Sequence, residues 1–179
     1  MRDETVAASE DVTRDVAFRQ LADQHLEASY RLAYAILGNA AEAQDATHDA
    51  FVLAWRKWST LRNRSAFEPW FDQIVVNTCR NRLKRAVRWR TQDLTDDVAS
   101  APGDPMGQAL DREVLSAALA MLSPDHRLVV ALRFYRDLTD KQIAQHLGIR
   151  RGTVRSRLHY ATKQLRVAFE AADAKESRR

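Results

Sequence analysis

The chain has 179 residues, and its 28 lysines and arginines against 24 aspartates and glutamates give a formal net charge of +4 at pH 7. This length suits one domain or two small ones, and the basic balance favours an acidic partner, with nucleic acid as the first candidate. The single cysteine, Cys79, excludes an intramolecular disulfide and a cysteine-rich zinc site. We expect it to be a small buried residue of a cytoplasmic protein, because no apolar run is long enough to span a membrane and the acidic N-terminus is not a signal peptide.

Apolar residues recur at spacings of three and four, while glycine and proline fall at boundaries, so the sequence predicts an all-α protein. We expect two small helical domains, at residues 14–90 and 111–172, the second of which contains a helix-turn-helix. Residues 91–110 are polar and acidic and hold two prolines and two glycines, a composition typical of a flexible linker. Residues 1–13 and 173–179 are expected to be disordered ends.

The N-terminal domain is predicted to contain three helices, at about 14–37, 41–57 and 66–89. The first ends where Gly38 and Asn39 interrupt the pattern. Its apolar side carries Leu26, Tyr30, Ala33, Ile36 and Leu37.

The second helix carries an acidic stripe in an otherwise basic protein. Glu42, Asp45 and Asp49 follow one another at spacings of three and four, so they share an outward face. A stripe of this kind is either a solvated surface or a docking surface for a basic partner, and the pattern alone leaves both interpretations open.

A polar loop, Ser59–Ser65, leads into the third helix, which begins with aromatic residues and ends with basic ones. Phe67, Trp70 and Phe71 are more typical of a core than of a base-stacking platform. The basic end is either a solvated helix end or a contact for nucleic-acid phosphates, and a DNA-reading segment further along the chain favours phosphates. Its basic residues are Arg80, Arg82, Lys84, Arg85, Arg88 and Arg90.

The C-terminal domain is predicted to contain four helices. Ser123, Pro124 and Asp125 are a strong helix start, with an N-cap residue, a proline at the first helical position and an acid in the first turn. The preceding helix is amphipathic through Val114, Leu115, Ala118, Leu119 and Leu122. The helix after Ser123 is expected to bury Leu128, Val129, Leu132 and Phe134.

The segment from Leu138 to Arg166 is the pattern of a helix-turn-helix. Thr139 and Gln142 form a capping box, Gly148 marks the turn, and a second helix starts near Gly152. Val154, Leu158, Ala161 and Leu165 are expected to face inward. The opposite face is polar and basic, as needed in a DNA major groove, and carries Arg155, Ser156, Arg157, His159, Tyr160, Lys163 and Arg166.

Taken together, these features resemble a bacterial RNA polymerase sigma factor of the extracytoplasmic-function (ECF, sigma-70 group IV) family. The first half of the resemblance is carried by YRLAYAILGNAAEAQDATHDAFVLAWRKW and SAFEPWFDQIVVNTCRNRLKR, and the second half by LSPDHRLVVALRFYRDLTDKQIAQHLGI and GTVRSRLHYATKQLR. The resemblance implies a region 2 domain that grips polymerase and reads the −10 element, and a region 4 domain that reads the −35 element. It also implies a monomer that binds core RNA polymerase and promoter DNA, is held by an anti-sigma factor, and has no cofactor, metal or catalytic residue.

The resemblance implies a role for each residue at a matching position of this chain. Core polymerase would be bound by Glu42, Asp45, His48 and Asp49. The −10 element and its unstacked non-template base would be contacted by Arg62, Asn63, Arg64, Ser65, Phe67, Asn77, Arg80 and Lys84. The −35 element would be read by Arg151, Thr153, Arg155, Ser156, Arg157, His159, Tyr160 and Lys163, with Arg151 and Lys163 better placed for phosphates.

The chain departs from the family pattern at a few positions. Pro69 lies in the first turn of the third helix and removes a backbone donor, and Arg64 replaces a residue that is often acidic or small. Arg150 and Arg151 stand where a capping or apolar residue is usual, which weakens the cap of the recognition helix by about 1 kcal/mol. His48 replaces a common glutamine in the docking segment.

Two other classes of function compete with a sigma factor. An autonomous helix-turn-helix regulator would usually need a dimer, and the sequence has no dedicated dimerisation segment and leaves the acidic stripe without a role. An enzyme is disfavoured because the chain has no nucleophile–histidine–acid set, metal-ligand spacing or phosphate-binding glycine loop.

Overall fold

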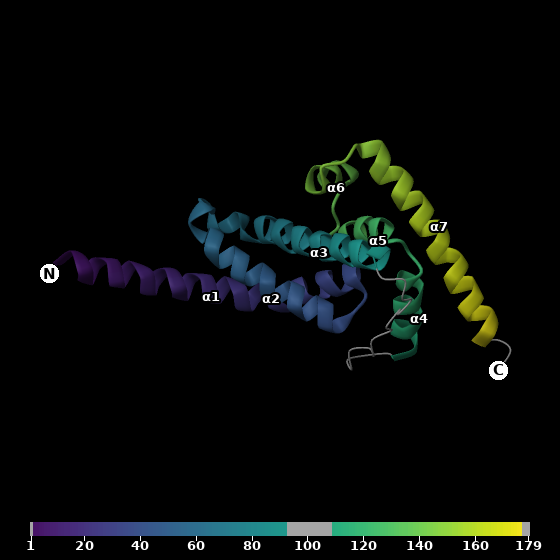
Figure 1. The fold of residues 1–179 in the computed structure, drawn as a ribbon, viewed down its shortest axis with the longest axis horizontal. Helices are drawn as coiled ribbons and strands as arrows, with labels where there is room; N and C mark the ends of the chain where they lie inside the picture. The colour runs from purple at the N-terminus through teal and green to yellow at the C-terminus, as the bar shows by residue number, and fades with distance from the viewer. Residues whose placement is uncertain (1, 93–108, 177–179) are drawn as a thin grey trace.

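The computed structural model describes residues 2–92 and 109–176, and every regular element in these two ranges is helical, as predicted. The first three long helices lie together, and the remaining four pack at one end of them (Figure 1). In chain order the elements are α1 (Arg2–Leu37), α2 (Ala40–Lys57), the 3-10 turns η1 (Trp58–Thr60) and η2 (Arg64–Ala66), α3 (Phe67–Gln92), α4 (Ala109–Ala120), α5 (Pro124–Val130), the π-helical turn η3 (Ala131–Tyr135), α6 (Asp140–Leu147) and α7 (Arg151–Glu176).

The α1–α3 bundle is built around small residues of α2. Ala43, Ala46, Ala50 and Ala54 recur at helical spacing and are fully buried. Because alanine projects only a methyl group, α1 and α3 can both approach α2 closely. At the C-terminal end of α2 larger rings fill the core, and these belong to Phe18, Trp58, Phe67 and Phe71.

The predicted helix boundaries are confirmed where capping chemistry defines them. Gly38 adopts a left-handed conformation, with φ of 70°, and ends α1, after which the Asn39 side chain accepts the backbone N–H of Glu42 at 2.9 Å. The capping box of Thr139 and Gln142 is present at the start of α6, and Gly148 ends that helix in a left-handed conformation.

One hydrophobic core passes through both halves of the chain. Leu32 and Ile36 of α1 belong to the same buried cluster as Leu128 of α5 and Leu132 of η3. The cluster continues to the helix-turn-helix, where Ile143, Leu147 and Val154 are buried. A smaller cluster joins the turn after α4 to α5 and α7 through Leu122, Val130 and Ala161.

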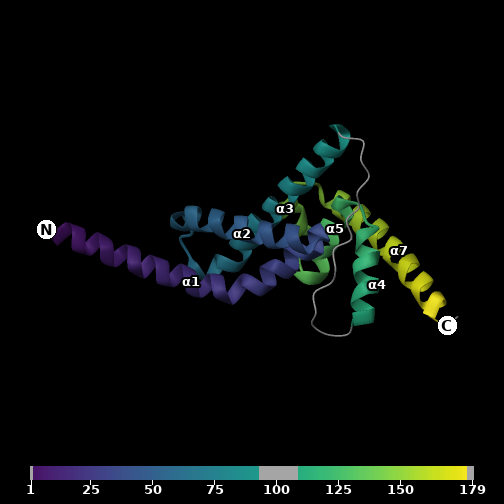
Figure 2. The ribbon, with the colours of Figure 1, turned by 60° about the horizontal axis from the view of Figure 1, so that its bottom comes forward.

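The ends of the chain differ from the prediction. α1 begins at Arg2 rather than near residue 14, and its first half projects beyond the bundle in both views (Figure 1, Figure 2). The acidic composition suggested disorder, but the segment contains no proline or glycine, and extending an existing helix costs little. α7 likewise continues to Glu176. Most of the predicted linker, residues 93–108, lies outside the described residues.

Three expected core residues are exposed. Phe134 is 67% exposed because it follows the fully buried Leu132 by two residues, and the helical repeat directs residues two apart to nearly opposite sides. Leu26 of α1 is exposed because the fully buried Ser29 occupies the inward position of that turn. Leu115 is exposed, whereas Ala118 is the buried residue of α4 and Leu122 is buried in the turn that follows it.

Candidate nucleic-acid interface

The acidic stripe lies on the surface of α2 and is paired with a residue of α3. All four predicted polymerase-binding side chains are exposed; they are Glu42, Asp45, His48 and Asp49. The Arg82 guanidinium binds three of them, with nitrogen–oxygen distances of 2.9 Å to Glu42, 2.7 Å to Asp49 and 3.7 Å to Asp45.

Arg82 was predicted only as one of several basic residues, and its position facing the stripe was missed. Burial alone would lower the pKa of its guanidinium, but the hydrogen bonds that it donates to Asp49 and Glu42 raise that pKa overall. Arg82 therefore holds the carboxylates of Glu42 and Asp49 in a fixed arrangement, and these carboxylates remain accessible from solvent.

The loop between α2 and α3 presents four exposed polar residues, as the prediction requires of a DNA-contacting segment. They are Arg62, Asn63, Arg64 and Ser65. The Asn63 side chain accepts the Ser65 backbone N–H at 3.0 Å and its hydroxyl at 2.8 Å, so Asn63 shapes the 3-10 turn that follows it. The Arg64 guanidinium lies 5.9 Å from the Trp58 ring centroid, a cation–π geometry.

The prediction that Phe67 contacts DNA is wrong. Its side chain is 1% exposed and packs among aromatic rings, with ring centroids 5.3 Å from Phe71 and 6.0 Å from Trp58. Burying a large aromatic side chain contributes about 1.5–3 kcal/mol, which a base-stacking role would forfeit. Phe67 instead supports the exposed loop from beneath. Phe71 is buried as expected, and Trp70 is half-buried.

A groove between α2 and α3 contains the other predicted −10 residues. Its volume is about 440 Å³, and its polar lining includes Lys57, Asn77, Arg80, Asn81 and Lys84. Amide groups can hydrogen-bond base edges, and cationic groups can neutralise phosphates. The groove therefore has the chemistry needed to hold a single nucleic-acid strand.

Two residues of α3 beside this groove also contact the helix-turn-helix. Arg80 donates to the carbonyl oxygen of Leu147 at 3.1 Å, and Gln73 donates to that of His146 at 3.0 Å. Both carbonyls lie in the last turn of α6, where the helix leaves its own acceptors unpaired. Gln73 was not among the predicted residues, and no local pattern reveals the Arg80 contact, because 67 residues separate its two partners in the sequence.

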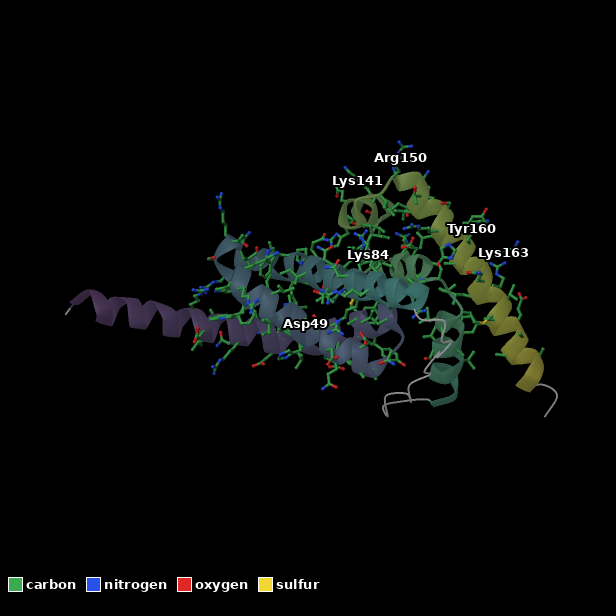
Figure 3. The ribbon with its side chains drawn as sticks, in the orientation of Figure 1. Asp49, Lys84, Lys141, Arg150, Tyr160 and Lys163 are labelled. Atoms are coloured by element: carbon green, nitrogen blue, oxygen red, sulfur yellow. The ribbon has the colours of Figure 1, made fainter. Side chains whose placement is uncertain are left out.

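The recognition helix α7 presents its polar face outward, as predicted. Val154 and Ala161 on the opposite face are fully buried. Figure 3 shows Tyr160 and Lys163 on the outer side of α7, away from α2. Of the predicted −35 residues, Thr153 and Arg157 are half-buried, and the others are exposed: Arg151, Arg155, Ser156, His159, Tyr160 and Lys163.

Two arginines of this face are paired with acids of their own half of the chain. Arg155 Nε lies 3.1 Å from an Asp140 carboxylate oxygen, and Arg157 forms a salt bridge with Asp125. Both pairs are partly solvent-exposed, and such pairs contribute about 0–1 kcal/mol, so the guanidinium groups can exchange partners cheaply.

These surfaces together define a helical protein with an exposed basic helix in a helix-turn-helix and an exposed row of carboxylates. The family models for sigma-70 region 2 and sigma-70 region 4 match residues 21–90 and 118–167. The chain belongs to the sigma-70 family of transcription initiation factors, in its extracytoplasmic-function group.

Comparison with individual proteins gives the same assignment. The ECF RNA polymerase sigma factor SigL of Mycobacterium tuberculosis is 33% identical over 157 residues, covering 85% of this chain and 88% of the relative. The RNA polymerase sigma-E factor of Streptomyces coelicolor is 28% identical over 161 residues, covering 87% and 88%. The fold is similar to that of the sigma factor RpoE of Bartonella quintana, solved with the anti-sigma factor NepR, with a TM-score of 0.70, 23% identity, and coverage of 86% and 96%.

The protein is therefore a sigma factor. It binds core RNA polymerase and directs promoter-specific transcription initiation, and it is not an enzyme. Within the ranges that the structure describes, no helix is long and apolar enough to cross a membrane.

Proposed function

We propose that the three surfaces divide the work of promoter recognition among polymerase, the −10 element and the −35 element. The observation that carries this proposal is the presence, on one chain, of an exposed row of carboxylates and an exposed DNA-reading helix. A solvated acidic face needs no fixed geometry, whereas Glu42 and Asp49 are held together by Arg82. The stripe of Glu42, Asp45, His48 and Asp49 binds a basic surface of core polymerase.

The groove of α3 and the preceding loop take the −10 element as a single strand. Extruding a base costs a few kcal/mol of lost stacking and pairing, which the site must offset. Two kinds of contact offset this cost. The base edge accepts or donates hydrogen bonds with Asn63 or Asn77, and the phosphates are bound by Arg64, Arg80 and Lys84. Arg62 and Ser65 extend the same polar surface.

The outer face of α7 reads the −35 element in the major groove. Arg155 and Arg157 can each bond two acceptors on a guanine edge, and Ser156, His159 and Tyr160 supply further polar contacts. Arg151, Thr153 and Lys163 bind backbone phosphates, which position the helix without reading sequence.

The protein acts in the cytoplasm as a monomer, and an anti-sigma factor inhibits it. Support for the inhibitor comes from the fold, which is similar to that of an RpoE solved in complex with the anti-sigma factor NepR. The inhibitor would cover the polymerase-binding and DNA-binding surfaces together.

Charge reversal in the stripe tests the proposal. The variant Asp45→Lys with Asp49→Lys should bind purified core polymerase at least about tenfold more weakly, since each close interfacial charge pair is worth about 1.5 kcal/mol or more. Asp23→Lys is the matched control, because Asp23 is an exposed acid on α1 outside the stripe. Equal polymerase affinity for the double variant and the control would exclude the stripe as the docking face.

A further inference from the structure

The first helix of the helix-turn-helix places a carboxylate against an arginine of the recognition helix. Asp140 Oδ2 accepts a hydrogen bond from Arg155 Nε at 3.1 Å. Asp140 is the first residue of α6, and Arg155 lies at the start of the second turn of α7, where the two helices meet (Figure 1). Residues in the N-terminal part of a recognition helix contact base edges, so this pair lies where a −35 sequence would be read.

The nitrogen that Arg155 gives to Asp140 leaves its base-reading end free. A guanidinium group carries five N–H donors, and the one bonded to the carboxylate is the Nε–H. The two terminal nitrogens can together donate to O6 and N7 of one guanine. The Arg155 side chain is 63% exposed and accessible to DNA. Arg155 therefore does not have to release Asp140 before it binds a guanine.

Asp140 is held more firmly than Arg155. Its side chain is only 23% exposed, and it lies in the first turn of α6, where the helix dipole favours an acid. Ile143 and Leu147 of α6 belong to the same buried cluster as Val154 of α7, so the two helices are packed firmly against each other. The carboxylate is therefore a fixed point from which the exposed arginine extends.

The other acid–arginine pair of this face is arranged differently. Asp125 of α5 accepts from Nη2 of Arg157, which is one of the two terminal nitrogens that a guanine contact uses. Here the acid is the exposed partner and the arginine is half-buried. Asp125 therefore occupies part of the group that would read DNA, whereas Asp140 leaves that group of its own arginine open.

We infer that Asp140 is a positioning residue for −35 recognition: it holds Arg155 at Nε so that the two terminal nitrogens face a guanine edge. The inference rests on the proposed function, in which α7 lies in the major groove. An arginine already bound at Nε has less conformational entropy to lose when it binds the base. An arginine paired with an acid is also less available to backbone phosphates, which carry no sequence information.

This role predicts two opposite effects when the acid is removed. Loss of a carboxylate beside DNA reduces its repulsion from phosphates, so Asp140→Ala should bind random-sequence duplex roughly twofold more tightly. The same variant should lose roughly three- to tenfold in discrimination at the base pair that Arg155 reads, because the arginine is no longer held in place. A purely structural role for Asp140 would weaken both kinds of binding, and a purely electrostatic role would leave the discrimination unchanged.

The measurement uses the full chain bound to core polymerase and a library of duplex promoters randomised across the −35 element. Selection of the bound promoters gives the base preference of the wild-type protein at each position. The position that Arg155 reads is the one at which Arg155→Ala loses its preference. Affinities for duplexes that differ only at this position then give the discrimination of each variant, and random-sequence duplex gives the non-specific affinity.

Asp125→Ala is the matched control. It removes the same charge from the first turn of α5 and leaves Arg155 with its partner. It should therefore keep the full preference at the position that Arg155 reads. Circular dichroism establishes that the variants fold. If Asp140→Ala does not fold, Asp140→Asn has nearly the same shape without the charge and carries the same expectation with a smaller loss of discrimination.

A double variant separates positioning from direct base contact. If Asp140 acts only through Arg155, adding Asp140→Ala to Arg155→Ala should cause no further loss at that position. A further loss, or full discrimination in Asp140→Ala alone, would overturn the inference and leave base reading by Arg155 intact. If Arg155→Ala loses preference at no position, the proposed role of Arg155 is itself wrong, and the inference about Asp140 fails with it.

Discussion

The two basic surfaces of the molecule, on α3 and on α7, have similar composition but different availability. The polar face of α7 points outward, and its arginines pair with Asp125 and Asp140 of the same half of the chain. On α3, Arg80 is half-buried and bonds a carbonyl of the other half. Whether a basic residue is free to bind DNA therefore depends on whether its present partner lies in the same half of the chain or in the other half. A count of charges does not show this.

The difference also predicts the order of events. An exposed arginine can exchange a nearby carboxylate for a DNA acceptor by a side-chain rotation, which takes nanoseconds or less. Releasing Arg80 requires a movement of domains, which takes microseconds to milliseconds. We therefore expect the −35 surface to be ready in the free protein and the −10 surface to become ready on opening.

The largest expected effect tests the apolar core that the two halves of the chain share. Leu132 is fully buried, and truncation to alanine should lower the free energy of unfolding by about 2–5 kcal/mol. Phe134→Ala, two residues away, should change it by less than about 0.5 kcal/mol, because Phe134 is mostly exposed. Urea unfolding measures both, and comparable losses would mean that Phe134 packs in the core.

A second pair of substitutions separates backbone strain from domain contact. Gly38 and Gly148 both have positive φ, 70° and 63°, so alanine should cost about 1 kcal/mol at either position. Only Gly38→Ala also displaces Arg127, and the two lost hydrogen bonds add about 0.5–1.5 kcal/mol each. Equal losses of unfolding free energy in the two variants would show that Arg127 does not depend on the missing Cβ.

A third test concerns the α7 surface in the polymerase-bound state. Arg155→Ala should weaken binding to the −35 element by about 1–3 kcal/mol and relax sequence preference at one position. Lys163→Ala should weaken binding to all DNA sequences alike and reduce the slope of log affinity against log salt concentration by about 1. Competition binding at several salt concentrations distinguishes them, and identical sequence profiles for the two variants would contradict base reading by Arg155.

The sequence predicted what local chemistry determines. Capping at Thr139 and Gln142, the left-handed Gly148 and the inward face of Val154 and Ala161 depend on residues within a turn or two, and all are present. The acidic stripe follows from helical spacing in the same way.

The errors occur where residues distant in sequence decide the outcome. Phe67 was assigned to DNA from the family resemblance, whereas rings from α1 and η1 enclose it. The pairing of Arg136 with Asp72, 64 residues earlier, has no signal in the local pattern.

The smallest expected effect is a dependence of the free energy of unfolding on pH. Burial raises the pKa of the Asp72 carboxyl to about 6, which outweighs the opposing charge of Arg136, while Glu68 raises it further. In the unfolded chain Asp72 meets water, and its pKa returns toward its ordinary value near 3.8. The folded state therefore holds a proton more tightly, so the contribution of Asp72 to stability should rise as the pH falls through 6 and decline above it.

Between pH 7 and pH 6 the expected gain in the free energy of unfolding is only about 0.4 kcal/mol, the amount that one group with a pKa of about 6 supplies over that interval. Urea unfolding at the two pH values measures it. Asp72→Asn is the control, because the amide keeps an oxygen acceptor for Arg136 and does not titrate, so its response should be smaller by that amount. An equal pH response in the wild-type protein and Asp72→Asn would place the titrating group elsewhere.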